Sequence, residues 1–146
     1  MTGITAVAVG DPRGGPVPAG PYAQCARIEF GSGALLQLAG QVAVDDDGTL
    51  VGPGDVAAQT EQVFTNLERI LAAHGAGFGD VVNLRTYLTD MDSIRDYGRV
   101  RLARLAGHQP TSTTVEVSRL FLPGALVEVE ALAVVASVSD AGRLRA

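Results

Sequence analysis

Three glutamates toward the C-terminus are the side chains whose type and spacing best suit chemistry. Glu116 follows a Thr-rich segment, while Glu128 and Glu130 stand two residues apart in an apolar run. Because strand side chains alternate, Glu128 and Glu130 are expected on one face of a strand. Two interpretations stay open. The carboxylates form a solvent-facing stripe that pairs with Arg119, or one of them is partly desolvated and acts as a general base.

The remaining reactive residue types exclude several mechanisms. His74 and His108 have no nucleophilic Ser and no acidic partner at motif spacing, so a Ser-His-Asp triad is not expected. No His, Cys and Asp cluster has metal-ligand spacing, and no G-x-G-x-x-G follows a strand. We therefore expect neither a metal nor a cofactor. Cys25 lies in an apolar segment and is expected to be a small buried residue rather than a nucleophile.

Charge and composition narrow the classes of partner. All eleven basic residues are Arg, and the net charge of the 146-residue chain is −5. The lack of Lys removes Schiff-base chemistry and lysine-anchored pyridoxal phosphate. An acidic chain also does not favour nucleic acid or an anionic membrane as a partner. Its most apolar stretch, residues 125–138, contains two glutamates and is not expected to span a membrane.

The length and the single cysteine suggest one domain in a reducing compartment. The first ten residues lack the basic region of a signal peptide, so we expect a cytoplasmic protein. We place the domain at residues 1–136 and expect residues 137–146 to form a flexible tail.

Hydrophobic periodicity predicts the elements that carry these residues. In the first helix, Val63, Leu67 and Ile70 share one face, with Asp55 as the N-cap and Gly75 just beyond the end. The second helix is expected to direct its apolar side chains toward the core: Ile94, Tyr97, Leu102 and Leu105. The predicted strands cover residues 4–9, 22–30, 34–44, 81–88, 113–117 and 126–135, and the helices cover residues 55–74 and 93–106.

This order of elements predicts an α+β fold with a mixed six-stranded sheet and both helices on one face. The sheet face without helices is expected to carry Val127, Val129, Ala131 and Ala133. An apolar face of that size does not stay exposed to water, which predicts an oligomer.

Six segments of the chain form an ordered set of motifs: GPYAQ (20–24), AGQ (39–41), DVAAQTEQVF (55–64), VVNLRTYLTDM (81–91), TVEV (114–117) and PGALVEVEAL (123–132). Together they span most of the chain, and the ordered set is more specific than any one of them. In this order the segments resemble the RidA/YjgF family of small proteins that hydrolyse reactive enamines and imines.

The resemblance implies a chorismate-mutase-like homotrimer with a central barrel-like core and an active site in each of three clefts between subunits. It implies a small-molecule substrate, with Glu130 as the catalytic carboxylate. Tyr22, Gly40 and Thr114 correspond to substrate-binding positions. The family also uses an Arg to hold the carboxylate of a 2-imino acid, and that position is Ser112 here.

A Ser at this position changes what the site is able to bind. Arg offers a planar fork for a carboxylate, whereas Ser112 offers one neutral donor. Either the substrate lacks the carboxylate, or Arg101, Arg104 or Arg119 enters the cleft.

Three functions stay open. They are an imine deaminase with an altered substrate range, a proton-transfer enzyme or cyclase for a larger imine or carbonyl metabolite, and a non-catalytic metabolite-binding protein. RNA cleavage, ascribed to the wider family, is disfavoured because phosphate contacts need basic residues.

Overall fold

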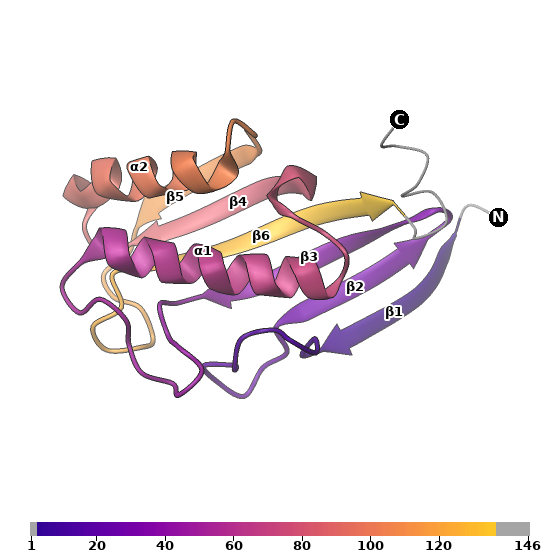
Figure 1. Cartoon of the computed structure of the whole chain (residues 1–146), viewed down its shortest axis with the longest axis horizontal. Coiled ribbons are helices and arrows are strands. Elements are labelled where there is room, and N and C mark those ends of the chain that lie inside the picture. The colour runs from indigo at the N-terminus through magenta and orange to yellow at the C-terminus, as the bar shows by residue number, and fades with distance from the viewer. Residues whose placement is uncertain (1–2, 137–146) are drawn as a thin grey trace.

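The structure, a computed structural model, describes residues 3–136 and contains one six-stranded sheet and two helices (Figure 1). The predicted α+β fold is confirmed. The tail expected at residues 137–146 lies outside the described residues. The strands are β1 (Ile4–Gly10), β2 (Cys25–Phe30), β3 (Gly33–Gln41), β4 (Val81–Leu88), β5 (Thr111–Glu116) and β6 (Val127–Ala136). The helices are α1 (Val56–Ala73) and α2 (Ile94–Leu105), with short 3-10 turns at Phe78–Asp80 and Met91–Ser93.

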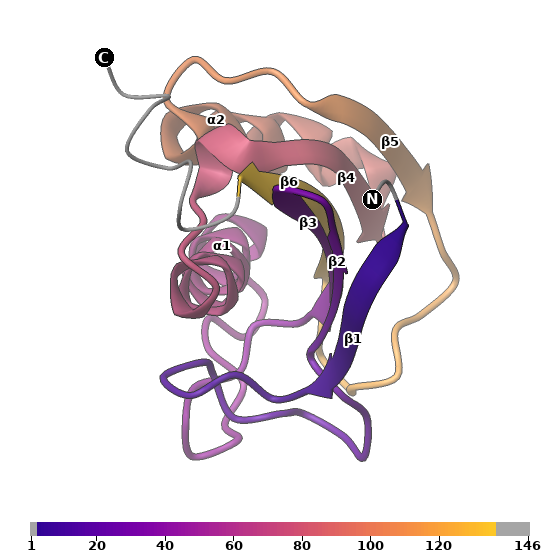
Figure 2. The same cartoon turned by 90° about the vertical axis from the view of Figure 1, so that its right-hand side faces the viewer.

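The strands lie in the order β1-β2-β3-β6-β4-β5, and only the β4–β5 pair is parallel. Helix α1 connects β3 to β4 across β6, and α2 connects β4 to its neighbour β5. Both crossovers place their helix on the same side of the sheet, as Figures 1 and 2 show. The other side, called here the helix-free face, is not covered by either helix.

The core lies between the sheet and the helices, and β6 crosses its middle. The β6 side chains that face the helices are buried: Val127, Val129, Ala131, Ala133 and Val135. They pack in one cluster with Phe64, Leu67 and Ile70 of α1. The expectation that the Val and Ala residues of β6 lie on the helix-free face was wrong. The helices cover the more apolar of the two β6 faces because burying that face removes more apolar area from water.

The helix-free face carries the opposite set of alternating residues. Its centre is polar, with Arg85 of β4 beside Glu130 of β6. Apolar side chains surround this centre, and several are largely exposed in the single chain, including Val134 at 42% and Val7 at 60%. The residues that define the helix-free face are Val7 of β1, Leu35 and Gln37 of β3, Glu128, Glu130, Leu132 and Val134 of β6, and Arg85 and Tyr87 of β4.

Helix α1 begins and ends where the sequence predicts. The Asp55 carboxylate accepts a hydrogen bond from the Ala58 backbone N–H at 3.0 Å, which satisfies one of the free donors of the first turn. Gly75 follows the helix with a φ of +72°, a conformation that glycine adopts without strain.

Helix α2 differs from the prediction on one face. Tyr97, Val100 and Leu105 are buried, whereas Leu102 is 65% exposed and Ile94, at the first turn, is 37% exposed. The contact stripe runs through positions 97, 100, 104 and 105 at helical spacing, and Leu102 lies away from it. The Tyr97 hydroxyl also shares a 2.6 Å hydrogen bond with Thr86 Oγ1, which anchors α2 to β4.

A buried glutamine ties α1 to the loop that precedes β6. Gln59 Nε2 donates to the carbonyls of Gly52 and Gly124 at 3.2 and 3.0 Å. Its Oε1 accepts from the Leu126 N–H at 2.8 Å. Two of these three bonds hold the end of the loop at residues 118–126, which enters the site described next.

Candidate functional site

A cavity of about 310 Å³ opens on the helix-free side of the sheet at the start of β6. Its walls come from four places in the chain: the segment before β2, the end of β3, the loop before β6, and β6 itself. The lining residues are Tyr22, Ala23, Ala39, Gly40, Phe121 and Glu128. The fold thus brings together two of the predicted site residues, Tyr22 and Gly40.

Gly40 makes room for a glutamate in this cavity. A Cβ atom built on Gly40 would lie 2.9 Å from Glu128 Cδ and closer still to Oε1. The β3–β6 register shifts between Leu38 and Gln41, and this bulge sets Gly40 against Glu128. A larger residue at position 40 would therefore force the Glu128 side chain to move from this position.

Tyr22 closes another side of the cavity. Its ring lies against Gly20, where an added Cβ atom would come within 2.7 Å of Tyr22 Cε1. Burial raises the pKa of the Tyr22 phenol, and the charge of Glu128 raises it further. The phenol is therefore neutral at physiological pH and retains its O–H donor.

Glu128 has the electrostatics of an acid–base group. Its side chain is half-buried, and burial raises its pKa, with repulsion from Glu130 as the second cause. Within residues 3–136 its carboxylate accepts no hydrogen bond and forms no ion pair. A carboxylate of this kind binds a proton more readily than a solvated one.

Glu130 has different surroundings, although it shares a strand face with Glu128. It accepts a 2.8 Å hydrogen bond from the Tyr87 hydroxyl and lies 3.7 Å from Arg85 Nη1. It lines a separate cavity of about 300 Å³ that also includes Gln37 and Leu132. Within one copy of the chain, Glu130 therefore does not line the cavity that contains Tyr22 and Gly40, although the family resemblance groups these three residues.

The physical reason for this difference is the spacing along β6. Glu128 and Glu130 are separated by ~6.6 Å along the strand, so only one of them meets Gly40. The β3 bulge decides which one, and a bulge is not visible in the alternation pattern. The sequence did place both carboxylates on one face, and that expectation is confirmed.

Ser112 and Thr114 lie elsewhere in the single chain. Both belong to the edge strand β5, where they pair with Leu84 and Thr86 of β4. Strand β4 separates them from Glu128, and neither lines the cavity. Their predicted contact with substrate is not formed within one copy of the described chain.

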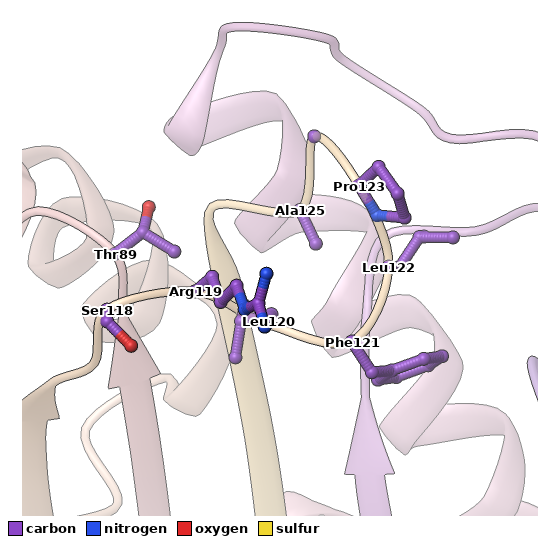
Figure 3. Close-up of a pocket in the computed structure, with 9 residues that line it drawn as sticks. Thr89, Ser118, Arg119, Leu120, Phe121, Leu122, Pro123 and Ala125 are labelled. Atoms are coloured by element: carbon purple, nitrogen blue, oxygen red, sulfur yellow. The ribbon is translucent and has the colours of Figure 1, made fainter.

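The three candidate arginines have different positions. Arg104 contacts Glu61 and Glu68 of α1 at 3.1 and 3.0 Å, and so holds the two helices together. Arg101 belongs to α2, on the side of the sheet opposite the helix-free face. Arg119 lines a third cavity, of about 450 Å³, together with the hydroxyl residues Thr89 and Ser118 (Figure 3).

Phe121 was not singled out from the sequence, although it lines both the Glu128 cavity and the Arg119 cavity. Its position in the Phe-Leu-Pro-Gly turn before the acidic strand is the feature that could have identified it. Arg85 was also missed. Its place beside Glu130 depends on β4 pairing with β6, which the order of elements does not specify.

Cys25 is a buried thiol, as expected. Burial raises its pKa to about 11, with Arg27 acting in the opposite direction. At neutral pH it is therefore protonated and a weak nucleophile.

No group of three or more His, Cys, Asp and Glu residues within 3–136 has the arrangement of a metal site. No described helix combines the length and the apolar character needed to cross a membrane.

This sheet order, with two helices on one face, defines the class: a single-domain α+β protein of the YjgF fold. The family described as Endoribonuclease L-PSP matches residues 13–135, and the chain belongs to this family, which includes the RidA and RutC proteins.

A RutC family protein of Pyrococcus horikoshii is 36% identical over 118 residues, covering 81% of this chain and 90% of that protein. A 2-iminobutanoate/2-iminopropanoate deaminase of Mus musculus is 30% identical over 119 residues, covering 82% of this chain and 84% of that protein. The crystal structure of RidA from an Antarctic Psychrobacter species matches with a TM-score of 0.73 at 29% identity. That match covers 84% of this chain and 94% of the other.

Proposed function

We propose that this protein is an imine deaminase that hydrolyses the C=N bond of reactive imines to a carbonyl compound and ammonia. The main observation in its support is the half-buried Glu128, whose pKa is raised. Glu128 lies against Gly40 in a cavity that Tyr22 also lines. The mouse relative named as a 2-iminobutanoate/2-iminopropanoate deaminase supports the reaction type. In this proposal Glu128, rather than Glu130, is the catalytic carboxylate.

The proposed reaction needs one proton acceptor that later returns its proton. Glu128 takes a proton from water while the water oxygen bonds to the carbon of a protonated imine, and the C=N π electrons move to nitrogen. Glu128 then protonates the nitrogen of the resulting carbinolamine. The C–N bond breaks, the hydroxyl oxygen forms the carbonyl, and its proton leaves with ammonia as ammonium. In this proposal the neutral Tyr22 phenol, which lines the same cavity, donates a hydrogen bond to the substrate.

We further propose that the site is completed in a homotrimer. The exposed apolar side chains of the helix-free face support burial against other copies of the chain. A neighbouring copy is also the only source from which Ser112 and Thr114 of β5 could approach the open cavity. Ser112 stands where a carboxylate-binding Arg is expected, so the substrate range differs from that of the 2-iminobutanoate enzymes.

The family's descriptive name mentions RNA cleavage, but this chain does not favour it. A net charge of −5 and the absence of Lys provide little attraction for phosphate groups. The free, buried thiol of Cys25 fits a reducing compartment, and we propose the cytoplasm.

A coupled assay tests the proposed function. An amino-acid oxidase generates imines in place, and the acceleration of ammonia release by the protein is measured. We expect Glu128→Gln to lower the rate by ~10²- to 10⁴-fold, the usual contribution of an acid–base group. The matched control is Glu130→Gln, which removes a carboxylate from the same strand face and should retain most of the activity.

Two results would contradict this proposal. One is an ammonia-release rate for the wild-type protein that never exceeds the uncatalysed rate with any imine. The other is a Glu128→Gln variant as active as wild type. Saturable binding of a carbonyl compound without turnover would instead indicate a binding protein.

A further inference from the structure

The cavity of about 450 Å³ beside the candidate active site has no role in the reaction as proposed. It is formed by the loop between β5 and β6, and its walls combine one cation, two hydroxyl residues and several apolar side chains. Figure 3 shows the Arg119 side chain extending into this space, with Thr89 and Ser118 on one side and Phe121 and Leu122 on the other. Because Phe121 also lines the Glu128 cavity, the two cavities are neighbours.

Arg119 is available to bind an anion. Within residues 3–136, no carboxylate lies within 4.0 Å of its guanidinium and it donates no hydrogen bond. Other arginines in the same part of the chain are engaged: Arg104 with α1 and Arg85 with Glu130. A guanidinium offers two parallel N–H donors that match the geometry of a carboxylate.

The loop that carries Arg119 is held firmly at its far end. Gly124 and Leu126 are fixed by the buried Gln59, and the Ala125 N–H donates to the Leu122 carbonyl at 3.1 Å. Strand β6 begins at Val127, directly after Leu126, so the Gln59 hydrogen bonds also help to position Glu128. Arg119 and the proposed acid–base group therefore sit at opposite ends of one constrained segment.

We propose that Arg119 forms an anion-binding subsite that receives the carboxylate of an imino acid whose reacting carbon lies at Glu128. This inference rests on the proposed function for the identity of the reacting group. It explains how an anionic substrate is held although Ser112 lacks a positive charge.

The walls of the subsite indicate the class of substrate. Each of the two cavities is within the usual volume range of ligand pockets, about 300–1,000 Å³, and an acid of three or four carbons fills only a small part of it. Leu120, Phe121 and Leu122 add apolar surface beside Arg119. The structure therefore assigns the site to imino acids that carry a large apolar side chain.

Binding of stable product analogues tests the subsite without requiring turnover. The probes are 2-oxo-4-phenylbutanoate, its neutral carboxamide, and the smaller 2-oxobutanoate, each titrated by calorimetry. We expect the wild-type protein to bind the phenyl acid more tightly than either of the other two. Arg119→Ala should weaken binding of the phenyl acid by about ten- to a hundredfold and leave binding of the carboxamide unchanged.

Two further variants serve as controls. Arg119→Lys keeps the charge without the fork and should give an intermediate affinity. Arg99→Ala removes an exposed arginine from α2, whose only ion pair in the described chain is with Asp96 at 3.7 Å. It should bind all three compounds as wild type does.

The subsite is disproved if Arg119→Ala binds the phenyl acid as tightly as wild type, or if wild type does not distinguish the acid from its carboxamide. It is also disproved if wild type binds none of the three compounds. If Glu128→Gln loses ammonia release while Arg119→Ala binds the phenyl acid as wild type does, the proposed deaminase activity is supported and the proposed subsite is contradicted. If binding depends on Arg119 but the protein releases no ammonia from any imine, the proposed subsite is supported and the proposed deaminase activity is contradicted.

Discussion

Glu128 and Glu130 lie on the same face of one strand, yet their carboxylates have different neighbours. Glu130 is bound by Tyr87 and lies near Arg85, and its hydrogen bond is the main reason that the pKa of the Tyr87 phenol is raised. Glu128 has no such partner in the described structure, and burial together with Glu130 raises its pKa. Glu128 is therefore the better proton acceptor of the two, and the charge of Glu130 helps to raise the pKa of Glu128.

This pairing predicts a pH effect. A base must be ionised to act, so the acid limb of kcat/KM should follow the raised pKa of Glu128 and lie at higher pH than for a solvated glutamate. Glu130→Gln removes the repulsion, which lowers the pKa of Glu128 and shifts the acid limb to lower pH. Burial, the larger cause, persists in the variant, so the shift should be partial. A shift to higher pH, or loss of activity at every pH, would contradict this assignment.

The raised pKa of Glu128 also predicts an effect on stability. The folded state binds the proton more tightly than the unfolded state, so the Glu128 carboxyl stabilises the fold best at low pH. That contribution is lost as pH rises through the folded-state pKa. Glu128→Gln should therefore raise the free energy of unfolding at pH 7.5, by roughly 1 kcal/mol or less because the site is half-exposed and screened. Urea unfolding at fixed protein concentration should show little difference near pH 3.5. A Glu128→Gln variant that is less stable than wild type at pH 7.5 would contradict the expected destabilisation by the ionised Glu128 carboxylate.

At the scale of elements, the site depends on how the end of β3 and the loop before β6 are held. The β3 bulge sets Gly40 against Glu128. Gln59 of α1 fixes residues 124–126 with two hydrogen bonds, and its third bond holds the Gly52 carbonyl. The helix thus positions a site on the opposite side of the sheet, although no helix residue lines it.

Removing the Gln59 amide should loosen the loop. Gln59→Ala leaves two carbonyls and one N–H without their partner, and we expect a loss of roughly 2–3 kcal/mol of stability. Hydrogen exchange should become faster in residues 118–126, and KM should rise more than kcat falls. Gln62→Ala is the matched control on α1, since the Gln62 amide bonds Val44 and Asn66 instead. Unchanged exchange in the loop would show that Gln59 does not position it.

At the scale of the whole molecule, the proposed trimer depends on the helix-free face. Its polar centre is surrounded by exposed apolar side chains, and the Glu128 cavity opens on the same side. A second copy covering this face would remove water from the cavity, which strengthens electrostatic interactions within it.

A charge placed on this face tests the assembly. Val134→Asp should dissociate the expected trimer and lower ammonia release, because a carboxylate in an apolar interface is costly to desolvate. Leu102→Asp is the control, since Leu102 is also an exposed apolar residue but lies on α2. Light scattering after size exclusion gives the mass of each variant. A wild-type protein that is monomeric and fully active would contradict the proposed trimer.

The sequence by itself determined the elements and the fold class. The apolar period of α1, its Asp55 cap and the β-rich segments are local properties, so their positions follow from neighbouring residues. The sequence also determined that Glu128 and Glu130 share a face, since alternation along a strand is a local rule.

Only the tertiary structure decided which face of β6 the helices cover and which glutamate meets Gly40. Val127 and Ala131 are apolar whichever face of the sheet they occupy. Their burial under the helices depends on how β6 inserts between β3 and β4. The position of Glu128 likewise depends on a bulge in a strand that is almost ninety residues earlier in the chain. Contacts between distant segments are set by the packing of the whole sheet, which no local pattern records.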